Sequence, residues 1–248
     1  MLEKKELVEL AKLKSLKPWQ QEKHYLQAVM LEILSDYPIV FKGGTYLWFY
    51  HGLPRFSEDL DFTATQELTK NLPETVSKSL ELFGIENKNK TITNNNTTLS
   101  FRISTKGPLN TSQIDECRVY VEISKRENIL EKTIPIKLDF PEYNLPTKRI
   151  TGMKLTELSA EKIRAIITRN KARDAYDLNY LIEKKKIPFK KTLANQKLEY
   201  YNKKFTKKEF LEKVKSKQEY YKKELKNLVF EELPNYKKIV KNLKNWIE

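Results

Sequence analysis

Apolar and polar positions follow two different periods along this chain. Apolar side chains at intervals of three and four predict helices over residues 2–15, from residue 18 to about 34, and from residue 73 to about 83. Alternation of apolar and polar side chains predicts short strands at 59–62, 97–104, 118–124 and 134–140, and the apolar run that follows Pro38 predicts a short buried strand at 39–41. From residue 155 onward every periodic segment is helical, at roughly 156–170, 174–184, 206–228 and 234–247.

This order of elements predicts a change of architecture near residue 150. Strands interleaved with helices over residues 1–150 favour an α/β or α+β fold, whereas residues 151–248 contain helices alone. A chain of 248 residues is long enough for one large domain or two modest ones. We therefore expect an N-terminal domain with a sheet and a helical C-terminal domain.

The positive charge is concentrated in the C-terminal quarter. The chain has 47 Lys+Arg and 33 Asp+Glu, a net charge of +14, and residues 183–248 contribute +11 of it through 20 Lys and 9 Glu. Such a field attracts polyanions such as nucleic acid, although a lysine-rich solvated helical surface has the same composition.

The composition also excludes several classes of protein. One cysteine excludes a disulfide framework, and two histidines argue against a multi-histidine metal centre. No apolar run is long enough to span a membrane, and no signal core follows Met1. We therefore expect a soluble cytoplasmic protein.

Two carboxylates in the predicted strand 59–62 are the first candidates for chemistry. Asp59 and Asp61 are two positions apart, so their side chains leave the same face of the strand about 7 Å apart, while Leu60 and Phe62 point into the core. Hard divalent cations take oxygen ligands, and phosphoryl-transfer enzymes hold such ions between carboxylates. Two carboxylates so placed can share Mg²⁺, with Mn²⁺ as the alternative ion, although acidic pairs at strand ends are common and the pair alone is a weak signal.

A glycine-rich turn precedes these carboxylates. Gly43, Gly44 and Thr45 lie between a predicted strand and a short predicted helix. Backbone N–H groups at such a turn bind anions, and glycine lets a phosphate approach the backbone, although a tight turn without a ligand has the same sequence. Arg55 and Ser57 add a cation and a hydroxyl suited to a triphosphate or a metal-bound water.

The segment over residues 42–62, KGGTYLWFYHGLPRFSEDLDF, resembles the nucleotidyltransferase motif of the AbiEii/AbiGii toxin family, a branch of the DNA polymerase β-like nucleotidyltransferase superfamily. The resemblance implies an α+β fold, with a mixed β-sheet flanked by helices over residues 1–150. It ends near residue 183, and the all-helical basic domain expected over 151–248 rests on periodicity and charge. The resemblance also implies nucleotide-binding roles for the residues of this motif outside the carboxylates, which are Lys42, Gly43, Gly44, Thr45, Arg55 and Ser57.

The superfamily has a third carboxylate on a neighbouring strand. Residues 118–127, RVYVEISKRE, resemble the motif that carries it, an acidic residue on a strand followed by Arg-Glu. Glu122 falls on the face opposite the valines of this strand and is the expected third metal ligand. Asp139, between Leu138 and Phe140, is the competing candidate and lacks the Arg-Glu flank.

A last resemblance covers residues 155–181, where Glu161-Lys162 is followed by an Arg-Asp-x-x-Asp pattern. It implies a catalytic role for Lys162 and nucleotide-binding roles for Arg173, Asp174 and Asp177. If the helix were continuous, Lys162, Arg169 and Arg173 would form a cationic stripe that faces a triphosphate. An ordinary solvated helix, with Asp174 capping the next one, is the alternative.

Together these resemblances imply a toxin that transfers a nucleoside monophosphate from an NTP to an RNA, the 3′ end of a tRNA, and releases pyrophosphate. They also imply a cognate antitoxin as partner, and the basic C-terminal helices would attract the RNA. Two other functions stay open: transfer of the nucleotide to a protein hydroxyl, and binding of nucleic acid without catalysis. The sequence does not predict which NTP is used.

Overall fold

The alternating segments form a mixed sheet. Its strands are β1 (Ile39–Lys42), β2 (Asp59–Ala64), β3 (Asn87–Asn94), β4 (Thr98–Thr105), β5 (Cys117–Ser124), β6 (Ile134–Leu138) and β7 (Lys148–Gly152). The computed structural model describes residues 1–248 apart from the side chain of Gln113. Within this described part, seven strands pair in the order β3-β4-β5-β2-β1-β7-β6. The pairs β2–β5 and β1–β7 are parallel, and the others are antiparallel.

Helices accompany the sheet and follow it. They are α1 (Lys4–Leu13), α2 (Pro18–Leu34), α3 (Gly43–His51), α4 (Leu72–Leu82), α5 (Leu155–Thr168), α6 (Arg173–Lys185), α7 (Lys191–Glu199), α8 (Lys207–Ser216), α9 (Gln218–Leu225) and α10 (Tyr236–Trp246). Among the described residues, none of these helices combines the length and the apolar character that crossing a membrane requires.

The chain divides into two compact units. The sheet unit contains Met1–Thr45, Glu58–Asn128 and Thr133–Gly152, and the helical unit contains Tyr46–Ser57, Ile129–Lys132 and Met153–Glu248. The division falls inside α3 at one point, and the boundary expected near residue 150 lies beside the last crossing, between Gly152 and Met153.

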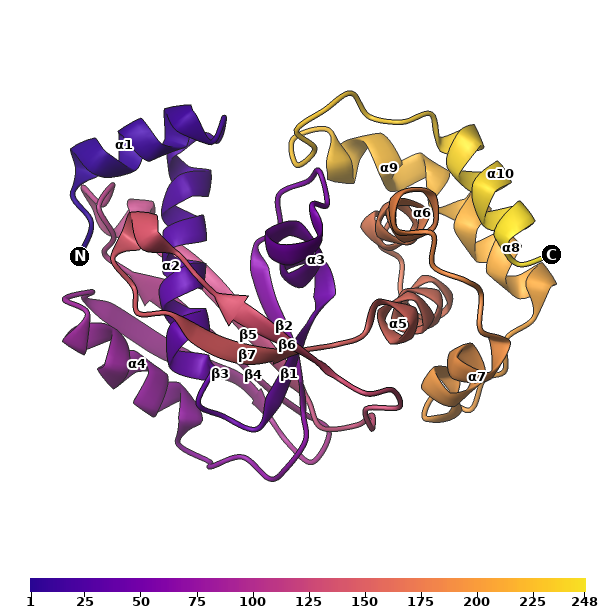
Figure 1. The fold of residues 1–248 in the computed structure, drawn as a ribbon, viewed down its shortest axis with the longest axis horizontal. Helices are drawn as coiled ribbons and strands as arrows, with labels where there is room; N and C mark the ends of the chain where they lie inside the picture. Colours follow the sequence, from indigo (N-terminus) through magenta and orange to yellow (C-terminus); the bar gives the residue numbers. More distant parts are fainter. The chain divides into compact units, whose positions relative to one another are not determined.

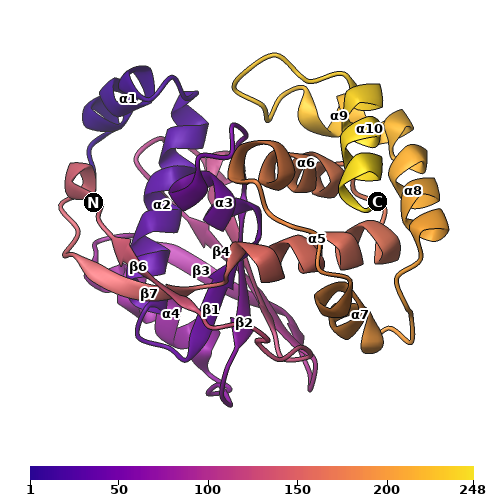
Figure 2. The same cartoon turned by 45° about the vertical axis from the view of Figure 1, so that its right-hand side comes forward.

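In the sheet unit one face of the sheet is covered by helices. The helices α2 and α4 pack on each other, α2 contacts β5, and α4 contacts β3 (Figures 1 and 2). The core side chains beneath them alternate along the strands, as in Leu60 and Phe62 of β2 and Val119 and Val121 of β5, all at most 1% exposed. Because neighbours in a strand face opposite ways, the polar side chains between them lie on the other face.

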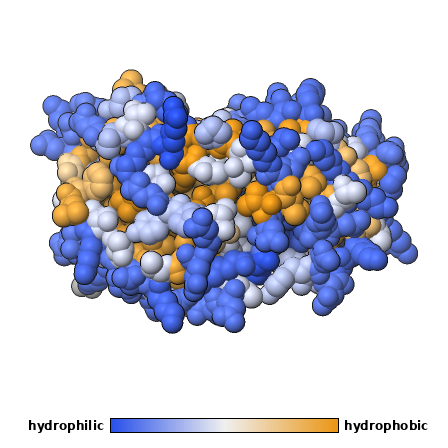
Figure 3. Space-filling view, turned by 60° about the horizontal axis from the view of Figure 1, so that its bottom comes forward, coloured by the Kyte–Doolittle hydropathy of each residue, from blue (hydrophilic) through white to orange (hydrophobic). Residues whose placement is uncertain are grey.

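In the helical unit α5 is the central packing partner. It contacts α6, α7 and α8, and α10 packs on α6 and α8. Hydrophilic side chains occupy much of the molecular face in Figure 3, as expected for a chain with 32% charged residues.

Four features differ from the sequence-based expectation. The strands β3 and β7 and the helix α7 were not predicted, and the helix expected over 206–228 is two helices, α8 and α9, that meet at Lys217. Periodicity did not predict β3 because its sequence, NKNKTITN, has one apolar side chain. The strand forms through its backbone pairing with β4 at the edge of the sheet.

Candidate active site

The three expected carboxylates lie on the open face of the sheet unit. Asp61 of β2 pairs in register with Glu122 of β5, and Asp59 pairs with Tyr120. Residues that are opposite each other in a ladder share a face, and neighbouring strands are about 4.8 Å apart. Asp59, Asp61 and Glu122 accordingly line one pocket of about 390 Å³, together with Tyr120 and Ile92.

The competing candidate Asp139 lies elsewhere on the sheet. It follows β6, which is separated from β2 by β1 and β7. Its carboxylate is exposed and bound to Lys137 at 2.5 Å, and this hydrogen bond holds the pKa of Asp139 below its usual value. Of the two candidates, Glu122 is therefore the one that the fold brings beside Asp61.

The carboxylate set suits a hard cation that is shared with a substrate. In the described part of the chain no three Asp, Glu, His or Cys side chains are already grouped as a metal site. Glu122 instead lies 3.5 Å from Arg126 and is 53% exposed. Mg²⁺ is usually bound through one or two carboxylates, with waters and substrate phosphates as its other ligands. Asp59 and Asp61 fit that pattern, and Glu122 fits it if its side chain turns away from Arg126.

The glycine turn is built around Asp61. Gly43 has φ +79°, a conformation that favours glycine, and an added Cβ would lie 2.1 Å from the Asp61 Oδ2 atom. The Thr45 hydroxyl donates a hydrogen bond to the backbone carbonyl of Asp59. The start of α3 and the start of β2 are thus held together, with a carboxylate directly over the turn.

Lys42 has an acidic neighbour that sequence reasoning did not assign. Its Nζ lies 3.7 Å from Glu127 Oε2, and the two side chains are 9% and 4% exposed. Glu127 belongs to the segment that resembles the third family motif, so its position was visible, but its partner, 85 residues earlier in the chain, was not. This ion pair joins the end of β1 to the loop after β5.

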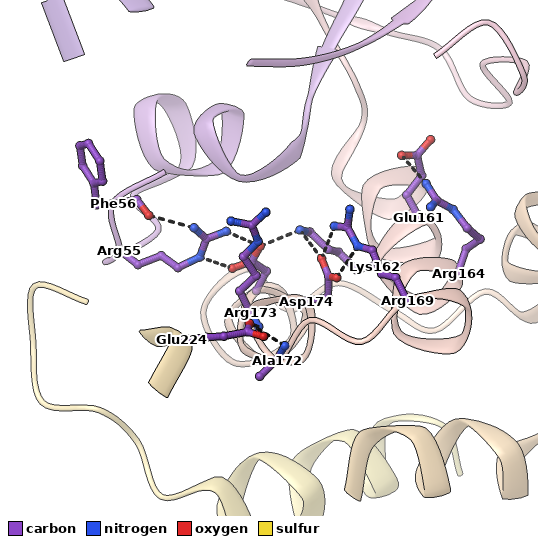
Figure 4. A network of polar contacts seen from close by, with 11 residues as sticks. Arg55, Phe56, Glu161, Lys162, Arg164, Arg169, Ala172, Arg173, Asp174 and Glu224 are labelled. Atoms are coloured by element: carbon purple, nitrogen blue, oxygen red, sulfur yellow. Dashed lines mark hydrogen bonds and ion pairs between the residues drawn. The ribbon is translucent and has the colours of Figure 1, made fainter. Parts of the chain in front are cut away.

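In the helical unit the predicted residues form a buried network. Arg55 donates from Nε and Nη2 to the two carboxylate oxygens of Asp177, at 2.6 and 2.7 Å. Its Nη1 donates to the carbonyl of Phe56 at 2.9 Å (Figure 4). Lys162 donates to the same Asp177 at 2.6 Å. Burial alone would raise the pKa of the Asp177 carboxyl, but Arg55 and Lys162 hold it below its usual value.

Asp174 is the second carboxylate of this network. It accepts from Lys162 at 3.1 Å and from Arg169 at 2.8 and 2.9 Å, and its side chain is fully buried (Figure 4). Burial would raise the pKa of Asp174, but these two cations hold it well below its ordinary range. The prediction of a continuous cationic stripe is wrong. The helix α5 ends at Thr168, and the backbone at Arg169 is extended, with φ −138° and ψ 161°.

The start of α6 is capped from another helix. The Glu224 carboxylate of α9 accepts the backbone N–H groups of Ala172 and Arg173, at 2.8 and 3.4 Å (Figure 4). This places a negative charge at the positive end of the helix dipole. Glu224 was not a sequence candidate, since nothing in a lysine-rich helix marks which glutamate contacts a distant N-terminus.

The structure thus gathers the predicted residues into two sets. In the sheet unit Lys42, Gly43, Gly44, Thr45, Asp59, Asp61 and Glu122 surround the turn and the open face. In the helical unit Arg55, Ser57, Lys162, Arg173, Asp174 and Asp177 lie in or beside the buried network. Their catalytic, metal-binding and nucleotide-binding roles stay predictions.

Comparison with known proteins identifies a matching family and similar solved structures. The family model for the nucleotidyl transferase AbiEii toxin of type IV toxin–antitoxin systems matches residues 24–243. No curated protein matches the chain. JHP933 from Helicobacter pylori is similar in structure, with a TM-score of 0.63, 20% identity, and coverage of 93% of this chain and 90% of that one. MenT4, the nucleotidyltransferase toxin Rv2826c from Mycobacterium tuberculosis H37Rv, has a TM-score of 0.65 at 18% identity, with coverage of 99% and 88%. The predicted α+β fold is confirmed.

Proposed function

This chain belongs to the AbiEii family of nucleotidyl transferase toxins, and we propose that it transfers a nucleoside monophosphate from an NTP to the 3′-hydroxyl of a tRNA. The observation that carries the proposal is the placement of Asp59, Asp61 and Glu122 on one open face, around a pocket of about 390 Å³. This pocket lies beside a turn that precedes a helix, where backbone N–H groups attract phosphate.

The reaction joins two substrates at the α-phosphorus of the NTP. The RNA 3′-hydroxyl oxygen forms a bond to that phosphorus, the bond to the pyrophosphate oxygen breaks, and the hydroxyl proton passes to solvent. Asp59, Asp61 and Glu122 would hold Mg²⁺, or Mn²⁺, and the ion would neutralise charge on the transferred phosphoryl group. The contribution of the protein is to position the two substrates and to balance their charge.

The glycine turn indicates where in the site the triphosphate binds. The N-terminal end of a helix carries partial positive charge, and α3 begins with Gly43, Gly44 and Thr45. Lys42, which directly precedes the turn, adds a cation whose charge is partly balanced by Glu127, 3.7 Å away. We assign the β- and γ-phosphates to this end of the site.

A labelling experiment tests the proposal. The protein is incubated with Mg²⁺, total tRNA and each of the four α-labelled NTPs in turn, and the Asp59→Ala/Asp61→Ala variant is treated in parallel. We expect label on tRNA with the wild type and none with the variant or with EDTA. Label on a protein instead would replace the acceptor by a protein hydroxyl, and no label with any NTP would overturn the proposed reaction.

Membership in this family also implies a protein partner. Members are toxins of type IV toxin–antitoxin systems, and we propose that a cognate antitoxin restrains this chain. Expression of the wild type without that partner should arrest growth, and the Asp59→Ala/Asp61→Ala variant should not. Equal arrest by both would show that toxicity does not depend on the carboxylates.

A further inference from the structure

The open face of the sheet unit continues beyond the carboxylates, across β5, β4 and β3. The ladder register sets Asp59 of β2 beside Tyr120 of β5, Arg102 of β4 and Lys90 of β3, in one row across the sheet. The next row toward the start of β5 contains Arg118 of β5, Ser104 of β4 and Lys88 of β3. Because strands are about 4.8 Å apart, this row reaches about 14 Å from Asp59 to the edge of the sheet.

The side chains of this face are of two kinds. Tyr120 and Ile92 are 40% and 51% exposed, and both line the pocket of the carboxylates. Ile92 lies where the β3–β4 register shifts between Thr91 and Thr93, and such a bulge re-aims a side chain. The pocket therefore has carboxylates on one side and apolar surface on the other.

Several cations of this face have no acidic partners. Lys90, Arg102 and Arg118 take part in no ion pair within the described residues, although the chain has 33 acidic side chains. The Arg102 Nε atom is buried and has no hydrogen-bond acceptor there. Three unpaired cations beside exposed apolar groups are the combination with which proteins bind single-stranded nucleic acid, through backbone phosphates and base stacking.

The in-line geometry of phosphoryl transfer indicates which substrate binds to this face. In phosphoryl transfer the attacking and leaving oxygens lie roughly in line on opposite sides of the phosphorus. The glycine turn follows β1, on one side of β2, and the face of β5, β4 and β3 lies on the other side. If pyrophosphate leaves toward the turn, the attacking hydroxyl comes from the β5 side.

We propose that the face formed by Lys90, Arg102, Arg118, Tyr120 and Ile92 holds the single-stranded 3′ end of the RNA acceptor. This inference rests on the proposed transferase function. The terminal base stacks on Tyr120, one strand from Asp59, so that the ribose lies at the carboxylates. The phosphates that precede it bind the three cations toward the β3 edge.

Charge and ring variants test this surface, because Lys90, Arg118 and Tyr120 are all exposed. The variants are Lys90→Glu/Arg118→Glu, Tyr120→Ala and Tyr120→Phe, and Lys4→Glu/Lys5→Glu on exposed positions of α1 is the matched charge control. Binding of a single-stranded RNA of about 12 nucleotides is measured by fluorescence anisotropy over a range of salt concentrations. The KM values for RNA and for the NTP are measured in the transfer assay.

The expected results separate stacking from charge. Loss of the ring in Tyr120→Ala should weaken RNA binding about tenfold and raise the KM for RNA without raising the KM for the NTP, and Tyr120→Phe should restore both. Lys90→Glu/Arg118→Glu should lower the slope of log affinity against log salt by at least about 1.4, since each lost phosphate contact contributes about 0.7. The Lys4→Glu/Lys5→Glu control should bind as the wild type does.

Two outcomes would overturn the inference. RNA binding by the variants equal to that of the wild type would show that this face does not hold RNA. A rise in the KM for the NTP alone would assign the face to the incoming nucleotide. The binding assay needs no catalysis, so a wild type that transfers nothing would refute the proposed function while anisotropy still decides on this surface.

Discussion

Replacement of Gly43 by alanine tests whether the turn is built for the Asp61 carboxylate. The added Cβ would lie 2.1 Å from Asp61 Oδ2 and 2.7 Å from Asp61 Cβ, whereas ordinary contacts begin at 3.4 Å. The carboxylate therefore has to move by more than an ångström. The backbone would also keep φ +79° with a side chain present.

Both effects have a known scale. A left-handed conformation costs a residue with a Cβ about 1–2 kcal/mol, and forcing an extra methyl group into a packed site costs about 1–3 kcal/mol. We therefore expect the free energy of unfolding of Gly43→Ala to be about 2–5 kcal/mol below that of the wild type. A displacement of about 1 Å in a catalytic group costs about 100-fold in rate, so transfer should fall at least that far in the folded variant.

Urea unfolding followed by circular dichroism gives the stability, and labelled NMP transfer in the absence of urea gives the rate. Gly44→Ala is the stability control, because Gly44 lies in α3 without a positive φ and alanine favours a helix by up to about 1 kcal/mol. The double variant Gly43→Ala/Asp61→Gly removes the clash, so its loss of stability should be smaller than the sum of the single losses by about 1–3 kcal/mol, while transfer stays absent. Strict additivity of the two losses, or a Gly43→Ala protein with wild-type stability and rate, would refute the reasoning.

Three further predictions concern other parts of the molecule. Glu122→Gln should lower kcat/KM for transfer about 100-fold, whereas Asp139→Asn should not change it, because only Glu122 lies in register with Asp61; equal effects would leave the third carboxylate unassigned. Asp177→Ala should lower the free energy of unfolding by about 3–5 kcal/mol, measured with urea, because Arg55 would stay buried without its carboxylate. Burial lowers the pKa of His24 to about 3, so the folded protein does not bind the proton that the unfolded chain binds below about pH 6.5. The free energy of unfolding should therefore fall by about 1.6 kcal/mol from pH 6.5 to pH 5, and the His24→Gln variant should lack this part of the slope.

The alternation of apolar and polar residues in β2 and β5 made the open face predictable, whereas the polar sequence of β3 gave no sign of the strand at the outer edge of that face. In β2 and β5 every second residue is apolar, so the faces of Asp59, Asp61 and Glu122 follow from their positions in the sequence. The strand β3 has almost no apolar residues, and it forms because its backbone completes a ladder with β4. A part of the face that we assign to RNA thus lies on a strand without a hydrophobic pattern, which periodicity does not detect.

Long-range ion pairs were beyond the reach of any local pattern. Arg55 and Asp177 are 122 residues apart, and no spacing rule predicts that they share two hydrogen bonds. Lys217 is a similar case: it is 1% exposed and donates to the Arg169 carbonyl at the point where α8 ends. A charged residue in a lysine-rich helix is expected in solvent, so the break between α8 and α9 was not visible in the sequence.

Burial also divides the acidic motif residues, all of which the resemblance places in the site, into two kinds. Asp59, Asp61 and Glu122 line a pocket that a substrate can enter. The carboxylates of Asp174 and Asp177 are fully buried and bind cations of the protein itself. A family motif contains residues that react and residues that hold the fold, because loss of either kind removes activity. Lost activity in an Asp177 variant is therefore evidence for a catalytic role only if its free energy of unfolding is unchanged, and the buried pair with Arg55 predicts that it is not.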